Sequence, residues 1–323
     1  MKASMKSTIT NLSPGVTIHG KWHQKVYRIV KRLGHGAIGV VYLAQCEGKY
    51  VALKISEQAA SITTEVNVLK AFGKVQGANL GPSLLDVDDW APSVNKQYSF
   101  YVMEYLHGVD LNTFLKSKGY EWLFILIIQL LDDLDHLHRA GWVFGDLKPE
   151  NLIVTKKPIR LRWIDVGGTT IKGRAVKEYT EFYDRGYWGF GSRKADPKYD
   201  LFAVAMVIVQ AYYPNRFDKG ANPQKTLKSK ISLHKELRKY AFCLHKAMEG
   251  SYASSKEMKQ DLSKIILARQ KQAEQTSTKK GLQHIQSKQT TSTNSHSTKW
   301  MESLGLVMVS AIVFMFFLLL SSF

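Results

Sequence analysis

Three polar side chains in one short stretch, Asp146, Lys148 and Asn151, have the types and the spacing needed to transfer a phosphoryl group to a hydroxyl. A carboxylate can accept the proton of the attacking hydroxyl, a lysine can neutralise the transferring phosphoryl group, and an amide oxygen can bind a metal ion. The residues between them complete the run Asp-Leu-Lys-Pro-Glu-Asn, which is hard to explain as an ordinary surface loop. We therefore interpret residues 146–151 as a catalytic loop.

A glycine-rich stretch upstream could hold the phosphates of a nucleotide. Gly34, Gly36 and Gly39 have the spacing G-x-G-x-x-G, which lets the backbone turn tightly and approach phosphate oxygens without a Cβ in the way. The pattern alone is weak, because dinucleotide-binding folds and ordinary loops also contain it. Here strand-like runs flank the glycines on both sides, at residues 27–33 and 40–45, which does not match the strand and helix of a dinucleotide-binding fold.

Two further motifs fit the same chemistry. Residues 51–54 read Val-Ala-Leu-Lys and form a third strand-like run, which ends in the cation Lys54. The sequence Ile-Asp-Val-Gly-Gly at 164–168 places a carboxylate, Asp165, fourteen residues after Asn151. An Asp-x-Gly triplet alone usually forms a turn, but at this distance from the catalytic loop its carboxylate could bind a metal ion.

These motifs resemble those of a eukaryotic-type (Hanks-type) serine/threonine protein kinase, over roughly residues 20–268. The Lys-Pro-Glu-Asn form of the loop resembles the serine/threonine branch, because tyrosine kinases carry other residues there. The resemblance implies an α+β, bilobal fold, with an N-lobe of five strands plus one helix (helix C) and a mainly helical C-lobe. It also implies ATP and Mg²⁺ as cofactors, and protein serine or threonine hydroxyls as acceptors.

The resemblance assigns roles to individual residues. Lys54 would hold the α- and β-phosphates. Residues 61–72 have apolar side chains at helical spacing, and Glu65, the acid of this predicted helix, would be the partner of Lys54. The alternative for Glu65 is a solvated position on the helix surface. Asn151 and Asp165 would bind Mg²⁺.

The same resemblance predicts the nucleotide pocket. Residues 100–106 look like the fifth strand and the hinge, with Met103 as gatekeeper. The backbone of Glu104 and Leu106 would bind adenine, and Asp110 would contact the ribose. Apolar side chains would close on the two faces of the base, and these are Val41, Ala52 and Ile153.

Later segments narrow the resemblance. Residues 200–205 look like the start of the buried central helix of the C-lobe. Residues 250–258 resemble the Arg-Tyr-x-Ser-x-x-Glu-Met ending that is common in bacterial kinases of this type. The overall pattern is closest to a short, membrane-tailed kinase of spore-forming Firmicutes, which would imply a role in sporulation.

Two departures from the family pattern bear on regulation. Residues 144–146 read Phe-Gly-Asp in place of His-Arg-Asp, so the arginine that grips an activation-loop phosphate is missing. The Ala-Pro-Glu element is also missing, with residues 189–191 in its place, and Ser251 stands where its buried arginine partner would lie. Losing one member of a buried ion pair costs about 3–5 kcal/mol, and losing both avoids that cost. The absence of both the Ala-Pro-Glu element and its arginine partner therefore indicates that this region follows a variant design.

An inactive kinase fold is the alternative reading of these motifs. Such a pseudokinase would act as a membrane-anchored scaffold that binds nucleic acid or lipid, since fold alone does not imply function. Pseudokinases typically lack the strand lysine, the catalytic aspartate or the metal-binding aspartate. This chain has Lys54, Asp146 and Asp165, which favours an active enzyme.

The last 21 residues, 303–323, contain no charged side chain. As a helix they would extend about 30 Å, the thickness of the hydrocarbon core of a bilayer. We therefore expect a single-pass C-terminal anchor in the cell membrane, with a buried core helix or strand as the alternative. Lys299 and Trp300 would lie at the interface, on the side that the positive-inside rule assigns to the cytoplasm, where the kinase domain would face ATP.

The remaining segments are expected to be less structured. Residues 1–19 would form an N-terminal extension. Residues 269–302 are rich in Gln, Ser, Thr and Lys and would form a flexible basic tether. Its hydroxyls at 276–278 and 290–293 are candidate autophosphorylation sites, or simply keep the tether solvated. The two cysteines are predicted to lie in different lobes, which indicates a reducing compartment.

The net charge of +18, from 45 basic and 27 acidic residues, calls for an explanation. General solubility is one. Attraction to an anionic leaflet, at about 1 kcal/mol per basic residue near the surface, is another. Binding to nucleic-acid phosphates is the third; without a base-reading motif, contact with DNA would be independent of sequence. A polyanion that gathers several copies would favour self-association and phosphorylation in trans.

Overall fold

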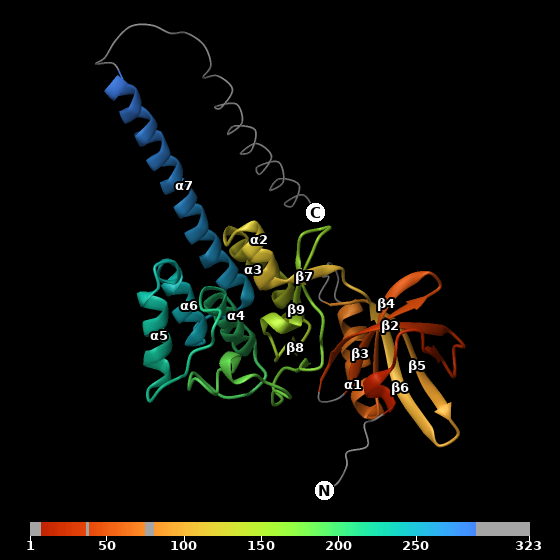
Figure 1. The fold of residues 1–323 in the computed structure, drawn as a ribbon. Coiled ribbons are helices and arrows are strands. Elements are labelled where there is room, and N and C mark those ends of the chain that lie inside the picture. The colour runs from red at the N-terminus through yellow and green to blue at the C-terminus, as the bar shows by residue number, and fades with distance from the viewer. Residues whose placement is uncertain (1–7, 37–38, 75–80, 289–323) are drawn as a thin grey trace. The chain divides into compact units, whose positions relative to one another are not determined.

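The structure, a computed structural model, describes residues 8–36, 39–74 and 81–288 of the 323-residue chain. The described residues up to Leu267 belong to one unit, which holds every predicted catalytic residue, and those from Ala268 onward belong to a second. Within the first unit, an N-lobe built on a sheet is joined to a C-lobe built mainly of helices near residue 104 (Figure 1). The predicted two-lobe arrangement is confirmed.

The N-lobe is an antiparallel sheet whose strands alternate in the face to which their side chains point. Leu53 and Phe100 point into a core on one face, whereas their neighbours Ala52 and Tyr101 point to the other face. Helix α1 (Ala59–Lys74) packs on that second face. The spatial order of the strands is β1-β2-β3-β4-β6-β5. Their bounds are β1 (Thr17–His19), β2 (Val26–His35), β3 (Val40–Cys46), β4 (Lys49–Ser56), β5 (Leu84–Ser93) and β6 (Lys96–Glu104).

The sheet has six strands where five were predicted. The added strand, β1, pairs antiparallel with β2 and buries Ile18 completely. Ile9, in the 3₁₀ helix η1 (Thr8–Asn11), is also buried, and its carbonyl oxygen accepts a hydrogen bond from the hydroxyl of Tyr42 at 2.8 Å. Part of the segment expected to be an extension therefore completes the N-lobe core. A three-residue strand is too short to show the alternation by which strands are recognised in a sequence.

The C-lobe contains two long helices that pack against each other. In α4 (Pro197–Tyr212) almost every side chain is buried, as expected for a central helix that is hydrophobic all round. Its partner in this packing is α3 (Glu121–Arg139). The remaining elements are α2 (Leu111–Lys118), α5 (Pro223–Leu233), α6 (Ala241–Met248), α7 (Ser255–Lys288), β7 (Gly108–Asp110), β8 (Trp142–Val143), β9 (Leu152–Thr155), β10 (Leu161–Trp163), β11 (Thr170–Ile171), η2 (Pro149–Asn151), η3 (Glu181–Tyr183) and η4 (Leu237–Tyr240).

Helix α7 extends into the segment expected to be a flexible tether. The backbone is helical from Ser255 to Lys288, so residues 269–288 are helical as well. The segment is poor in large apolar residues, which suggested a solvated tether, but it is rich in Gln and Lys, which have high helix propensity. No helix within 8–36, 39–74 and 81–288 is both long and apolar enough to cross a membrane. The expected anchor at 303–323, like residues 289–302, lies outside the described residues.

Candidate active site

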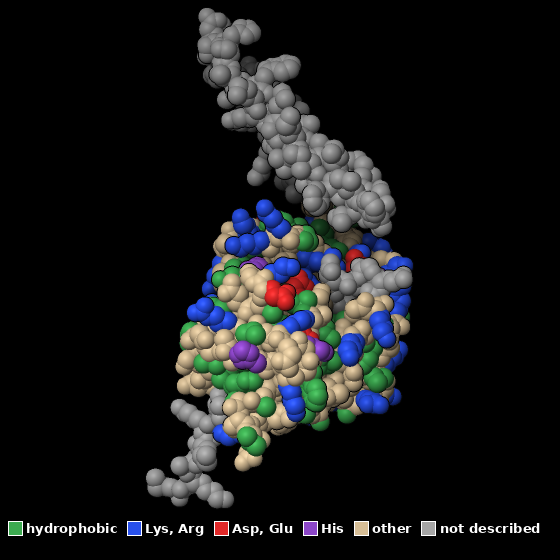
Figure 2. Space-filling model, turned by 90° about the vertical axis from the view of Figure 1, so that its right-hand side faces the viewer, with side chains coloured by type: hydrophobic (Ala, Val, Ile, Leu, Met, Phe, Trp, Pro, Cys, Tyr) green, Lys and Arg blue, Asp and Glu red, His purple; other side chains and the backbone are tan. Residues whose placement is uncertain are grey.

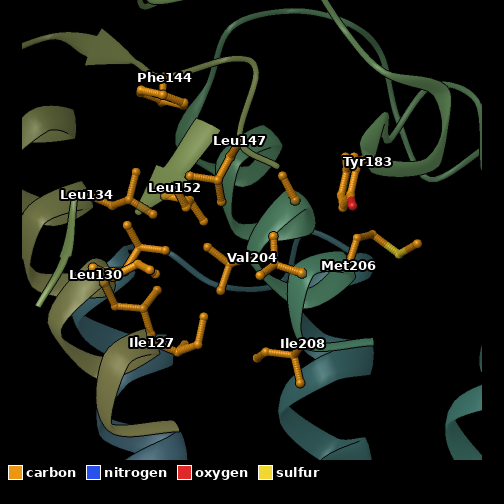
Figure 3. Close-up of a cluster of buried hydrophobic side chains, with 14 of the residues drawn as sticks. Ile127, Leu130, Leu134, Phe144, Leu147, Leu152, Tyr183, Val204, Met206 and Ile208 are labelled. Atoms are coloured by element: carbon orange, nitrogen blue, oxygen red, sulfur yellow. The ribbon is translucent and has the colours of Figure 1, made fainter. Parts of the chain in front are cut away.

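The catalytic loop is anchored by apolar side chains in the C-lobe core. Leu147 in the loop and Leu152 at the start of β9 both point into the cluster between α3 and α4 (Figure 3). Phe144 stacks on Trp163, with ring centroids 4.6 Å apart. The aromatic residue that replaces the usual histidine therefore keeps the packing beneath the site, and the polar residues of the loop lie on a rigid support.

The carboxylate of Asp146 is buried and is held by two neighbours in the loop. Its Oδ2 accepts hydrogen bonds from Lys148 Nζ at 2.6 Å and from Asn151 Nδ2 at 2.9 Å. Burial raises the pKa of Asp146, and the hydrogen bonds from Lys148 and Asn151 oppose that rise. A carboxylate with a raised pKa is a stronger proton acceptor. Because the amide nitrogen of Asn151 is engaged by Asp146, its amide oxygen is left for another ligand.

A buried carboxylate on helix α4 fixes the backbone of the same loop. Asp200 is fully buried and accepts hydrogen bonds from the backbone N–H groups of Phe144 and Gly145, both at 2.8 Å. Nε2 of His138 lies 2.8 Å from this carboxylate, and Nδ1 of His138 lies 2.9 Å from the hydroxyl of Ser255. The loop is thus connected to α3, α4 and the first turn of α7 through one buried hydrogen-bonded chain.

Lys54 lies in a second buried polar cluster, in the N-lobe. Its Nζ lies 2.9 Å and 2.7 Å from the two carboxylate oxygens of Glu65 and 3.6 Å from Oδ1 of Asp165. Burial acts to lower the pKa of Lys54, but Asp165 and Glu65 outweigh it and raise the pKa. The hydroxyl of Tyr101 donates to the second oxygen of Glu65 at 2.7 Å, and burial raises the pKa of Tyr101, which keeps it a neutral donor. The predicted ion pair is present, and the alternative of a solvated Glu65 is excluded by its burial.

A further carboxylate, that of Glu178, lies close enough to the two clusters to be affected by their charges. Burial and the charges of Asp165 and Asp146 raise the pKa of Glu178, a third acid near the site. Carboxylate and amide oxygens are ligands that a hard divalent cation such as Mg²⁺ prefers. The half-exposed carboxylate of Asp165 and the amide oxygen of Asn151 would hold such an ion, which would supply positive charge beside the phosphates.

The three glycines of the glycine-rich stretch lie at the end of β2 and directly before β3. The N–H of Gly36 donates to the carbonyl oxygen of Gly39 at 2.9 Å. A Cβ on Gly39 would lie 2.5 Å from the carbonyl oxygen of Ile55, so close backbone approach requires this glycine. Gly34 and Gly36 have no atom within 4 Å of a Cβ position, which leaves open space beside these two glycines for a ligand.

An ion pair that the sequence did not suggest lies at the predicted hinge. Arg162 on β10 donates from both terminal nitrogens to Glu104, at 2.9 Å and 3.1 Å. Partial burial acts to raise the pKa of Glu104, but these hydrogen bonds lower it. Asp110 caps helix α2 through a 2.9 Å hydrogen bond from the N–H of Thr113. The other predicted pocket residues are Val41 on β3, Ala52 on β4, Met103 on β6, Leu106 just after β6 and Ile153 on β9.

Comparison with known proteins assigns the chain that carries these features to one family. The model of the protein kinase domain matches residues 27–286. The chain belongs to the protein kinase family. It is 52% identical to the serine/threonine-protein kinase YabT of Bacillus subtilis over 263 residues, which make up 81% of this chain and 78% of YabT. This similarity confirms the expected resemblance to a bacterial Hanks-type kinase, and the activity is that of an ATP-dependent serine/threonine protein kinase.

More distant kinases match a smaller part of the chain. The serine/threonine-protein kinase RIM15 of Saccharomyces cerevisiae is 34% identical over 139 residues, 40% of this chain and 8% of RIM15. Human serine/threonine-protein kinase greatwall is 33% identical over 135 residues, 41% of this chain and 15% of greatwall.

The kinase has a steric reason for glycine at position 145, where an arginine was expected from the family pattern. Gly145 has φ +81°, in the left-handed region that favours glycine. A Cβ at this position would lie 2.8 Å from the carbonyl oxygen of Gly168, and a Cβ on Gly168 would lie 2.6 Å from that of Asp146. The catalytic loop and the Asp165 loop therefore touch backbone to backbone, and no side chain fits between them.

The activation segment of the kinase is ordered instead by a carboxylate of its own. Asp184 is fully buried and accepts hydrogen bonds from the N–H groups of Gly186 and Tyr187, at 2.9 Å and 3.0 Å. Arg193 donates to the same carboxylate at 2.8 Å, and the hydroxyl of Tyr199 donates to it at 3.0 Å. The carboxylate of Asp184 thus gathers the donors of a segment that lacks the family's phosphate-binding arginine.

The region around residues 189–191 and Ser251 also has its own ion pair. Ser251 is exposed, so it does not replace a buried partner. The buried guanidinium of Arg185 pairs with Asp196 at 3.4 Å. A Cβ on Gly250 would lie 3.9 Å from Arg185, which places this arginine beside the segment that precedes α7. Arg185 belongs to the activation segment, and Asp196 is the residue that caps α4.

Sequence reasoning missed three residues that hold the site together: Tyr101, Asp184 and Asp200. Asp200 gave the clearest signal, since it is an acid at the start of an otherwise apolar helix, but its partners are 55 and 56 residues away. Tyr101 lies in a strand of apolar and aromatic residues, where nothing marks its hydroxyl as functional. Asp184 is adjacent to Arg185, and nothing in the local sequence marks its carboxylate as buried.

Proposed function

We propose that Asp146 accepts the proton of the protein hydroxyl while Lys148, 2.6 Å away, neutralises the phosphoryl group as it is transferred. Lys54 would hold the α- and β-phosphates of ATP, positioned by Glu65 and Tyr101. This assignment rests on the presence of two separate buried clusters, one around Asp146 and one around Lys54, with Asp165 lying 3.6 Å from Lys54. Incorporation of labelled γ-phosphate by the wild type and by Asp146→Ala tests the assignment.

We further propose that residues 303–323 anchor the kinase in the cell membrane with the kinase domain facing the cytoplasm. The proposal rests on the uncharged run and on the adjacent Lys299 and Trp300. Deletion of 303–323 should move the protein from the membrane fraction to the soluble fraction and leave intrinsic catalysis unchanged. Retention of the truncated protein in the membrane fraction at high salt would show that the anchor lies elsewhere.

We also propose that a polyanion, DNA in the first place, binds the kinase and stimulates it. The support is the net charge of +18. On the face drawn in Figure 2, Lys and Arg side chains are spread widely and do not form a single band, which suits contact without sequence preference. On the C-lobe, Lys225 and Lys228 line an open hollow of about 520 Å³ along α5. Copies gathered on one polyanion would phosphorylate one another in trans.

The polyanion proposal is tested by measuring autophosphorylation with and without DNA at low and high salt. Stimulation should fall steeply as salt rises, because bound phosphates release counterions. Lys225→Glu should weaken it, whereas Asp146→Ala should remove activity and retain DNA binding. If DNA has no effect but anionic vesicles stimulate the full chain, the charge serves the membrane surface instead.

A further inference from the structure

The acidic side chain that the catalytic loop exposes near Asp146 is already paired with a cation from a distant part of the chain. Glu150 lies four residues after Asp146, and its side chain is 53% exposed. Arg216, in the loop that follows α4, donates from Nη2 to Oε1 of Glu150 at 2.5 Å. An exposed ion pair of this kind is worth only about 0–1 kcal/mol to stability. The ion pair between Glu150 and Arg216 is therefore more important for which ligands bind at this surface than for stability.

The guanidinium of Arg216 is also held against two aromatic rings of the activation segment. It lies 5.3 Å from the ring centroid of Tyr183 and 5.9 Å from that of Phe182, within the range of cation–π attraction. The next residue, Phe217, packs its ring against Phe182, with centroids 5.3 Å apart. The hydroxyl of Tyr183 donates to the buried amide of Gln210, which is neutral. Arg216 is thus preorganised, and Glu150 is the carboxylate that its guanidinium contacts.

This surface adjoins the catalytic base. Nζ of Lys148, which contacts Asp146, also donates to Oγ1 of Thr180 at 3.2 Å. Phe182 and Tyr183 follow Thr180 by two and three residues, and Glu150 follows Lys148 by two. Arg216 is therefore connected, through Glu150 and through the rings of Phe182 and Tyr183, to the two segments that meet at the contact between Lys148 and Thr180.

The charges at this surface disfavour a basic side chain next to the acceptor. A lysine or arginine of the substrate would have to displace Arg216 from Glu150, and would be repelled by it. An acidic side chain, by contrast, can use the further N–H donors of the planar guanidinium, which match a carboxylate in two-point geometry. The same loop carries Asp218 and Lys219, whose charges cancel, and the ammonium of Lys219 lies 4.2 Å from the ring centroid of Tyr187.

We propose that Arg216 determines substrate specificity and makes this kinase favour serine or threonine acceptors flanked by acidic residues. The proposal rests on the serine/threonine kinase activity and on no assumption about the anchor or the polyanion. It predicts a preference that can be inverted by changing the charge of one side chain.

The test uses the full chain in detergent micelles and three peptides that differ only in the residues flanking one serine, which are Glu, Gln or Lys. The wild type should phosphorylate the Glu peptide with a kcat/KM about tenfold above that of the Lys peptide. Arg216→Glu should invert this ratio, and Arg216→Lys should keep its sign with a smaller value, because an ammonium cannot form the two-point contact. The Gln peptide reports catalysis that does not depend on flanking charge.

Two further variants keep the result interpretable. Glu150→Gln retains Arg216 and removes its competitor, so the preference for the Glu peptide should increase. Arg139→Glu is a matched control, since Arg139 also pairs with a carboxylate, Asp135, at 3.0 Å on helix α3. The control should leave the ratio unchanged. Equal kcat/KM for the Glu and Lys peptides in the wild type overturns the proposal, as does a ratio that Arg216→Glu does not alter. Loss of activity on all three peptides in the wild type would instead contradict the assignment of the catalytic residues.

Discussion

The nucleotide side and the protein-substrate side of this active site are organised differently. On the nucleotide side, Lys54, Glu65 and Tyr101 form a closed, buried polar cluster of the kind that the family pattern implies. On the protein-substrate side, the family's arginine and its Ala-Pro-Glu element are absent, and Asp184 and Arg193 order the activation segment instead.

The two ligands explain this difference. ATP presents the same phosphates to every protein kinase, so the groups that hold it are restricted to a few side chains at fixed distances. A protein acceptor differs from one kinase to the next, and the loop that receives it needs only to be ordered. A buried carboxylate with several donors can supply that order as well as a phosphate can. The chain therefore departs from the family pattern on the side of the active site that receives its particular protein substrate.

The largest expected effect would test the side of the site that follows the family pattern. Asp146→Ala should reduce phosphotransfer about 100- to 10,000-fold, the usual contribution of a positioned general base. Incorporation of labelled γ-phosphate measures this, and circular dichroism should show an unchanged fold. Turnover within a few-fold of the wild type, in a preparation free of other kinases, would mean that Asp146 is not the base.

Gly145→Ala tests the backbone contact that replaced the arginine. It should destabilise the kinase by about 2–4 kcal/mol and lower activity, because the new Cβ would meet the carbonyl oxygen of Gly168 in addition to the unfavourable φ. Gly141→Ala is the matched control, since Gly141 has φ +84° and no atom within 4 Å of a Cβ position. It should cost about 1 kcal/mol and retain activity. If urea unfolding shows that both variants lose the same free energy of unfolding, the close backbone contact at Gly145 does not contribute to stability.

Asp184→Asn tests whether the segment carries its own ordering anion. Removing the charge weakens the hydrogen bonds from Arg193 and Tyr199 and should cost about 1.5–3 kcal/mol of folding stability, with a drop in kcat. Phosphatase treatment of the wild type should leave its initial rate on an added peptide unchanged, because no phosphate on the segment is needed. A kinase that phosphatase inactivates would argue that a phosphate, and not Asp184, orders the segment.

Tyr101→Phe is expected to have the smallest effect and bears on the nucleotide side alone. It removes one hydrogen bond to Glu65, worth about 0.5–1.5 kcal/mol, and leaves the pair with Lys54 in place. The KM for ATP should rise by a small factor while the preference among peptides stays as in the wild type. A change in peptide preference would show that the two sides of the site are coupled.

The sequence alone predicted which residues of the candidate site lie together where that depends on local spacing. Asp146, Lys148 and Asn151 lie within six residues, so one short loop must bring them together. Lys54 and Glu65 are eleven residues apart, on a strand and the helix that follows it, and the predicted pair is present. The two lobes and the central helix were also predicted, because the motifs resemble those of a protein kinase and the resemblance implies that fold.

Only the tertiary structure decided which distant groups complete the site. Asp200 binds a loop more than 50 residues before it, Arg216 meets Glu150 across 66 residues, and Gly145 is required by a backbone contact with Gly168. The strand β1 likewise exists because β2 offers it an edge. A sequence pattern records the spacing of neighbours along the chain, whereas these contacts depend on how separate elements pack, and a buried charge or a left-handed glycine has no distinct local signature.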